Sequence, residues 1–235
     1  PDTVATAAND RAGPRVRQSR RRACTSAWVL EFTVEDISAE EIARLRALYE
    51  PLACSVRDLV DATIRTRADA QTVAAVQADI DAAVARLRST QIDGAFGVRR
   101  TTSGESIGWG NAVIGIRNAL APPLEVRHEP DGRRWADFHL GATYEGPPGH
   151  VHGGVSALIL DHVLGEAASP DRKPRFTGSI TMRYLRATPL GPLHAEAAIT
   201  RTDGVKTFCA GHIADAEGIT VEAEGVFITP RWLRD

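Results

Sequence analysis

One long apolar segment precedes four segments with strand-like patterns. Residues 153–168 read GGVSALILDHVLGEAA, and Ser169-Pro170-Asp171 ends this segment. A helix that is apolar on most of its surface has to be buried by other elements. The segments that follow it alternate apolar and polar residues between turn signals: 175–188, 193–202, 206–215 and 218–229. The sequence therefore predicts an α+β fold, in which an antiparallel sheet curls around one apolar helix and the four last strands form a meander.

Two further strands are predicted before the apolar helix. LEVRHE (124–129) and RRWADFHLGA (133–142) flank Pro130-Asp131-Gly132, which is a hairpin signal. The stretch 105–123 is rich in Gly and Asn, and we interpret it as a loop with one short strand.

The N-terminal part of the chain has a different pattern. In 37–90, Ser38 and Glu41 form a capping box, and apolar residues then recur at helical spacing. Pro51 is expected to break or restart this first helix, and 68–87 reads as a second amphipathic helix. We therefore predict an Arg-rich tail (1–26), a helical hairpin extension (27–95) that covers the main domain, and the main domain itself (96–235).

Composition excludes several classes of protein. A net charge of −2 gives no global attraction to nucleic acid or to a membrane surface, and no apolar run approaches the roughly 18 residues of a membrane span. Cys24, Cys54 and Cys209 are too far apart for a disulfide framework or a thiolate metal site, so a cytoplasmic, reducing location is expected. The basic start lacks the apolar segment of a secretory signal; it has some likeness to a transit peptide, against which Asp2 and Asp10 argue.

The apolar helix contains one aspartate in an unexpected position. On a helical wheel His162 and Glu166 form a polar edge, whereas Asp161 lies about 100–140° away among apolar residues. A buried carboxylate is costly unless it is hydrogen-bonded. Asp161 is therefore expected either to pair with an arginine such as Arg183 or to face a solvent gap, or to act as an acid–base or nucleophilic group.

Two glycines follow a histidine where this helix should begin. The first N–H groups of a helix have no partner within it, and Gly153 and Gly154 carry no side chain that would keep a ligand oxygen away. The N–H groups after His152 therefore suggest an oxyanion hole. Gly154 and Asp161 are separated by about 10 Å along one helix, so they can act on one bond only if two copies pack antiparallel about a two-fold axis.

These motifs resemble a known family. Glu145-Gly146-Pro147-Pro148-Gly149 is followed by the His-Gly-Gly of 152–154, then by Asp161 nine residues after the histidine, and ITMRYLRATPLGPL spans 180–193. The pattern is similar to that of the hotdog-fold acyl-CoA thioesterases, in the branch that includes mitochondrial long-chain enzymes. The resemblance covers roughly 105–230 and implies a hotdog domain with an N-terminal helical extension outside it.

The resemblance also implies roles for individual residues. Asp161 would be the general base on a water or the nucleophile on the thioester. Gly154, with Gly153, would donate N–H groups to the carbonyl oxygen, and His152 would orient that corner. Thr177 lies where relatives carry a Ser or Thr that positions the water or the acid.

Other positions are less closely matched. Many relatives carry an Asn where this chain has Gly146, and His150 is a substitute candidate for substrate binding. Arg201 and Lys206 could bind the phosphates of coenzyme A, although they could equally be solvated turn charges.

The implied function is hydrolysis of acyl-CoA to free acid and CoA, a reaction of lipid metabolism, by a homodimer or a dimer of dimers. No cofactor is expected besides the CoA of the substrate. The alternatives are a non-catalytic acyl-CoA-binding or regulatory hotdog module and, third, a hotdog dehydratase. A metal site at His150 and His152 with His162 is not expected, because two glycines and a helix follow. Cys209 reads as a core residue, and Ser156 lacks the G-x-S-x-G context of a nucleophile.

Overall fold

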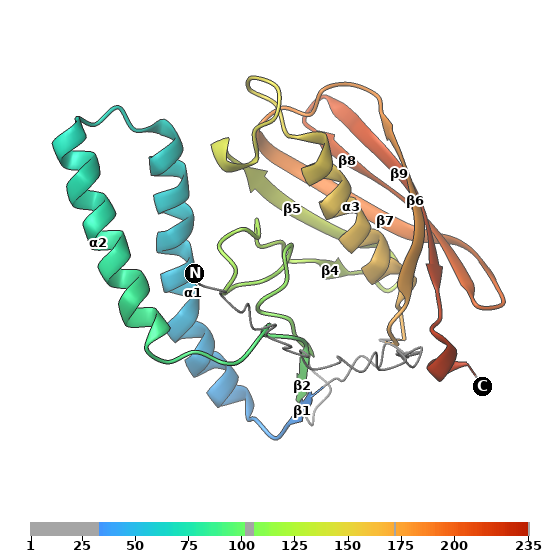
Figure 1. Cartoon of the computed structure of the whole chain (residues 1–235). Helices are drawn as coiled ribbons and strands as arrows, with labels where there is room; N and C mark the ends of the chain where they lie inside the picture. Colours follow the sequence, from blue (N-terminus) through green and yellow to red (C-terminus); the bar gives the residue numbers. More distant parts are fainter. Residues whose placement is uncertain (1–32, 102–105, 172, 235) are drawn as a thin grey trace, which may run out of the picture. The chain divides into compact units, whose positions relative to one another are not determined.

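The computed structural model describes residues 33–101, 106–171 and 173–234, and the predicted tail (1–26) lies outside them. A six-stranded antiparallel sheet curls around helix α3 (Gly153–Ala168), as Figure 1 shows. The strands are β4 (Arg127–His128), β5 (Arg134–Leu140), β6 (Phe176–Tyr184), β7 (Gly191–Asp203), β8 (Lys206–Asp215) and β9 (Gly218–Ile228). Their order in the sheet is β4-β5-β7-β8-β9-β6. The predicted α+β class is confirmed, and α3 and β8 have the predicted bounds.

The predicted four-strand meander is wrong in one respect. Only β7, β8 and β9 form a meander, whereas β6 pairs with β9 at the far edge of the sheet. Because β6 lies at the edge of the sheet, β5 can pair with β7. Helix α3 crosses the concave face between β5 and the edge strand β6. Each strand shows the same alternation of side chains, so the sequence pattern carries no information on strand order.

The core lies between α3 and the central strands. Ile159, Leu160, Val163 and Leu164 are fully buried on the helix. Small buried residues on the strands, such as Ala195, let the helix lie close to the sheet, and Phe227 fills the space nearer its end. Burial of each large apolar side chain contributes roughly 1.5–3 kcal/mol, so this interface is the main source of stability.

The N-terminal helices are α1 (Ala39–Arg65) and α2 (Ala70–Arg88). Ser38 caps α1, since its side chain accepts a hydrogen bond from the N–H of Glu41 at 3.2 Å. The predicted break at Pro51 is wrong, because α1 continues through it. A proline removes one N–H donor from a helix but can adopt helical φ, and packing of Ala53, which is 5% exposed, helps to offset the cost.

A small second sheet joins distant parts of the chain. It contains β1 (Thr33–Glu35), β2 (Arg99–Thr101) and β3 (Ser106–Ile107), and β1 pairs with β2 in parallel. β3 is the short strand predicted within 105–123. The division between extension and main domain at 95/96 stays a prediction. Two short 3₁₀ helices complete the elements, η1 (Ala142–Tyr144) and η2 (Arg231–Leu233).

Helix α1 is attached to the long loop before β4 by Arg57. Its guanidinium donates hydrogen bonds to the carbonyl oxygens of Gly115, Asn118 and Ala121 at 3.2, 3.0 and 3.1 Å. The hydroxyl of Tyr144, at the end of η1, donates to Leu120 O of the same loop at 2.9 Å. This loop therefore connects the helical extension to the segment that leads into α3. In the part of the chain that the structure describes, no helix is both long and apolar enough to cross a membrane.

Candidate active site

A tight turn built by the Glu-Gly-Pro-Pro-Gly motif leads into α3. Gly149 has φ +75°, which favours glycine, and its N–H donates to the Glu145 carboxylate at 2.6 Å. A Cβ on Gly146 would lie 2.7 Å from Cα of His152, which is too close, so only glycine fits at this position. The N–H of His152 donates to Tyr144 O at 2.9 Å. The motif therefore places His152 at the start of the helix.

His152 is the N-cap of α3. Its ring nitrogen Nδ1 accepts a hydrogen bond from the N–H of Gly154 at 3.0 Å. This N–H is the one that the sequence predicts for the oxyanion hole, and in the structure the imidazole is its acceptor. Both residues are exposed, so solvent or a ligand can reach them.

Tyr184, at the end of β6, contacts the first residue of the helix. Its hydroxyl donates to the carbonyl oxygen of Gly153 at 2.9 Å. A Cβ on Gly153 would lie 3.3 Å from the Tyr184 ring, so a glycine here lets the ring lie against the backbone. Tyr184 is not among the site residues that the sequence predicts, because a tyrosine in a strand is ordinarily a packing residue.

Asp161 is half-buried on α3. It accepts a hydrogen bond from the Thr177 hydroxyl at 2.7 Å, between Oγ1 and Oδ1. The alternative pairing with Arg183 does not occur, since Arg183 lies 3.5 Å from Glu222. The structure therefore brings Asp161 and Thr177 together and leaves the carboxylate without an arginine partner among the described residues.

Thr177 and Tyr184 both face α3 although seven residues separate them. Side chains of a regular strand alternate, so an odd separation normally places two residues on opposite faces. The pairing of β6 with β9 shifts register between Thr177 and Ser179, which is a β-bulge at Gly178. The bulge allows one strand to contact both the start of α3 and Asp161.

The uncovered face of α3 carries the candidate groups. Seven residues turn a helix to within about 20° of the starting direction, so Gly154 and Asp161 lie on one face, about 10 Å apart along the axis. Leu158 lies between them and is 39% exposed. Within one chain these two groups cannot reach the same bond.

The other predicted substrate-binding residues lie apart from this face. Nδ1 of His150 lies 2.8 Å from Pro148 O within the turn. The Arg201 guanidinium lies over the Phe208 ring, 3.4 Å from its centroid, beside a hollow of about 440 Å³. Lys206 is two residues from Phe208, and alternation places both on the face of the sheet away from α3. Arg201 and Lys206 are thus not brought to Asp161 in one chain.

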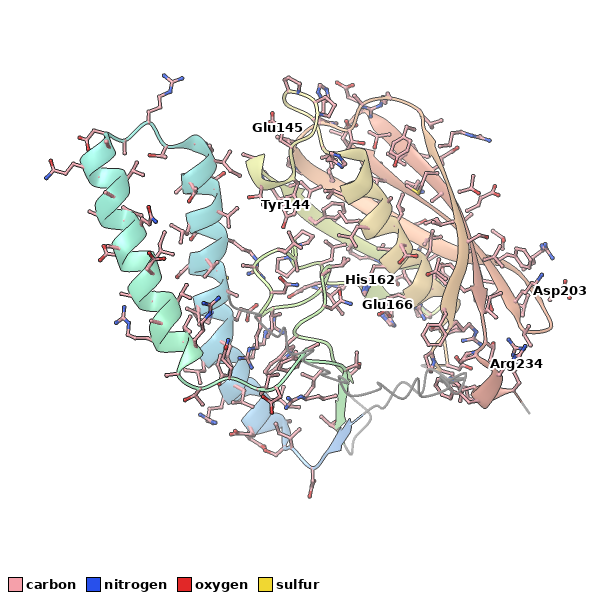
Figure 2. All side chains as sticks on the ribbon, viewed as in Figure 1. Tyr144, Glu145, His162, Glu166, Asp203 and Arg234 are labelled. Atoms are coloured by element: carbon pink, nitrogen blue, oxygen red, sulfur yellow. The ribbon has the colours of Figure 1, made fainter. Side chains whose placement is uncertain are left out.

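Further titratable groups lie near α3. His162 and Glu166 point from one side of the helix (Figure 2), and burial lowers the pKa of His162, which keeps the imidazole neutral. Burial raises the pKa of the Cys209 thiol to about 11, so at neutral pH the thiol is protonated and is a poor nucleophile. Cys209 is 2% exposed, and its predicted place in the core is confirmed. Over residues 33–101, 106–171 and 173–234, no three His, Cys, Asp or Glu side chains are grouped so as to hold a metal ion.

A curled antiparallel sheet around one helix is the fold of the hotdog class of proteins. In this chain the helix starts with His-Gly-Gly and carries an aspartate on its outer face. The family model described as "Thioesterase superfamily" matches residues 148–222. A crystal structure of a thioesterase superfamily protein is 35% identical, covers 84% of this chain and 94% of its own, and superposes with a TM-score of 0.69. The chain belongs to the thioesterase superfamily.

Curated relatives match over a shorter region. Human acyl-coenzyme A thioesterase THEM5 is 28% identical over 94 residues, which is 39% of this chain and 38% of THEM5. Acyl-coenzyme A thioesterase THEM4 of Xenopus laevis is 31% identical over 94 residues, which is 39% of this chain and 42% of THEM4. The chain thus spans about two fifths of the length of the curated relatives it matches.

Proposed function

We propose that this protein hydrolyses acyl-CoA thioesters to free acid and CoA. The observation that carries the proposal is that the N–H of Gly154 and the carboxylate of Asp161, held by Thr177, lie on the same uncovered face of α3. The relatives named acyl-coenzyme A thioesterases support the substrate class.

The catalytic unit of the proposal is a dimer. If two α3 helices pack antiparallel about a two-fold axis with Gly154 opposite the partner's Asp161, the axis passes between Ala157 and Leu158. The helix face at this point is apolar, and Leu158 is 39% exposed in one chain. Each site then uses a backbone donor from one protomer and a carboxylate from its partner.

The groups at such a site divide the reaction between them. The Gly154 N–H stabilises the oxyanion that forms on the thioester carbonyl. As a general base, Asp161 takes a proton from water, the hydroxide adds to the carbonyl carbon, and collapse of the intermediate breaks the C–S bond, with the proton passing to the CoA thiolate. As a nucleophile, Asp161 instead adds to the carbonyl carbon, and the C–S bond breaks with loss of the CoA thiolate to leave an acyl anhydride. Water then hydrolyses the anhydride to free acid and the Asp161 carboxylate, and its remaining proton passes to the thiolate. In both routes the Thr177 hydroxyl fixes one carboxylate oxygen and leaves the other available.

The His152 cap has a consequence for substrate binding. Because Nδ1 accepts the Gly154 N–H at 3.0 Å, a thioester oxygen has to share or replace this acceptor. His152 is exposed, so its ring has room to turn away from the helix. In this proposal His152 holds the donor in place until the substrate arrives.

Turnover of a panel of acyl-CoA thioesters of different chain length tests the function. The wild type should release free thiol, and Asp161→Asn and Asp161→Ala should lower kcat by several orders of magnitude with the fold intact. Binding of acyl-CoA without thiol release by the wild type on any chain length would favour a non-catalytic binding module instead.

Mixed dimers test the shared site. Gly154→Pro removes the N–H donor and Asp161→Ala removes the carboxylate, so each variant alone should be inactive. A heterodimer of the two should regain up to one working site. Absence of activity in heterodimers of verified composition would contradict a site shared between protomers.

A further inference from the structure

One peptide group connects Tyr184 to the candidate oxyanion donor. Tyr184 donates its hydroxyl to the carbonyl oxygen of Gly153 at 2.9 Å, and the N–H of Gly154 donates to His152 Nδ1 at 3.0 Å. The Gly153 carbonyl and the Gly154 N–H belong to the same peptide bond. The Tyr184 hydroxyl, this peptide group and the His152 ring therefore form a chain of hydrogen bonds.

We propose that Tyr184 is a positioning residue that strengthens and aims the Gly154 N–H as a donor to the substrate. The inference rests on the proposed thioester hydrolysis. A hydrogen bond to a peptide carbonyl polarises the peptide, so the N–H on its other side becomes a stronger donor. The bond also fixes the plane of the peptide, and with it the direction of the N–H.

The surroundings of Tyr184 are suited to this role. Gly153 has no side chain, and the ring of Tyr184 lies against the space that a Cβ would occupy, 3.3 Å from it. The bulge at Gly178 gives β6 the register in which Tyr184 faces the start of α3 while Thr177 faces Asp161. A single strand thus contacts both halves of the candidate machinery, the donor through Tyr184 and the carboxylate through Thr177.

The size of the effect follows from known magnitudes. Loss of one oxyanion donor lowers kcat about 10²–10³-fold. Cooperative strengthening contributes about 10–30% of a hydrogen bond, so loss of the Tyr184 hydroxyl should lower kcat about two- to eightfold. KM should hardly change, because the donor acts mainly on the charge that develops in the transition state.

Tyr184→Phe is the test variant, since it keeps the ring and removes only the hydroxyl. Tyr144→Phe is the matched control, because the Tyr144 hydroxyl also donates to a backbone carbonyl, Leu120 O at 2.9 Å, away from the Gly153–Gly154 peptide. The oligomeric state of both variants is measured with the activity. We expect the fall in kcat for Tyr184→Phe alone.

A spectroscopic measurement separates this inference from the proposed function. The chain has one Gly-Gly pair, Gly153-Gly154, so glycine labelled with ¹³C at the carbonyl and with ¹⁵N gives one directly bonded ¹³C–¹⁵N pair between residues. In Tyr184→Phe the Gly153 carbonyl ¹³C and Gly154 amide ¹H resonances of this pair should move upfield, whereas Tyr144→Phe should leave them in place.

The outcomes are distinct. The role of Tyr184 would be overturned if the resonances do not move in Tyr184→Phe, or if this variant raises KM and leaves kcat unchanged. An equal fall in kcat for Tyr144→Phe would also overturn it. If the wild type shows no thioester hydrolysis, the proposed function fails, and the resonances alone decide whether Tyr184 polarises this peptide. A 3-fluorotyrosine at 184, a stronger donor, should move both resonances downfield.

Discussion

The hydrogen bond between Thr177 and Asp161 is the most specific contact at the scale of single residues. It joins a strand to the outer face of α3 at 2.7 Å, and Asp161 has no arginine partner among the described residues. A carboxylate held by one hydroxyl keeps its second oxygen for a water or a thioester. The contact therefore gives the proposed reaction a defined geometry without neutralising the carboxylate.

Replacement of Thr177 tests this contact. Thr177→Val has nearly the same shape but lacks the hydroxyl, and a hydrogen bond to a charged group is worth about 1.5–3 kcal/mol. We expect kcat for acyl-CoA hydrolysis to fall by about one to two orders of magnitude, measured by thiol release. Thr177→Ser retains a hydroxyl and should keep most of the activity. Equal rates for Thr177→Val and the wild type would show that the contact has no role in turnover.

At the scale of elements, the segment that follows β6 is joined by an ion pair to the end of β8, next to the start of β9. The Arg186 guanidinium donates to both carboxylate oxygens of Asp215, with Nη1 2.8 Å from Oδ2, and also to Gly218 O at 2.9 Å. Hydrogen bonding from Arg186 lowers the pKa of Asp215 to about 2. The pair therefore holds the edge strand that carries Thr177 and Tyr184.

The ion pair predicts a pH dependence of stability. A carboxyl group whose folded pKa lies below its unfolded value of about 3.9 stabilises the fold above that value, and this contribution disappears as the pH falls from about 4 to 2. Asp215→Asn should therefore unfold at a lower urea concentration than the wild type at pH 6. The difference between the two proteins should shrink towards pH 2, if both remain folded without urea. A constant difference over this range would contradict the role of the Asp215 charge.

At the scale of the whole molecule, Arg57 attaches the helical extension to the loop before β4. Three backbone carbonyls accept from its guanidinium. Without Arg57, Gly115 O and Asn118 O would each keep one backbone N–H donor, whereas the part-buried Ala121 O would lose its donor. Since the same loop accepts the Tyr144 hydroxyl, the extension is connected to the segment that precedes His152. The extension is thus tethered through α1, while α2 has no buried residue, and its predicted role as a cover on the main domain stays a prediction.

Arg57→Met measures that attachment. We expect a loss of about 1–3 kcal/mol in the free energy of unfolding, measured by urea titration. Arg65→Met is the control, because Arg65 forms a solvent-exposed ion pair with Asp61, and such pairs contribute at most about 1 kcal/mol. Equal losses for the two variants would show that Arg57 does not anchor the extension.

Sequence reasoning succeeded where local pattern decides structure. The bounds of α3 follow from the glycines at its start and from Ser169-Pro170-Asp171 at its end, and the turn at Asp203-Gly204 fixes the start of β8. It failed at Pro51, where packing of α1 outweighs the local cost of a proline. It left open whether Asp161 pairs with Arg183 or faces a solvent gap, because a helical wheel shows which residues share a face but not which face the sheet covers.

The amino-acid sequence by itself determined most of the elements, the family resemblance and the residues proposed for the reaction, because caps, turns and apolar periodicity act over a few neighbouring positions. Only the tertiary structure decided that β6 lies beside β9, that a bulge turns Thr177 and Tyr184 to the same face, and that Tyr184 reaches the Gly153 carbonyl. Such contacts depend on strand order and register between segments far apart in the chain. Strand order and register are set by the arrangement that buries the apolar side of α3 and pairs every central strand.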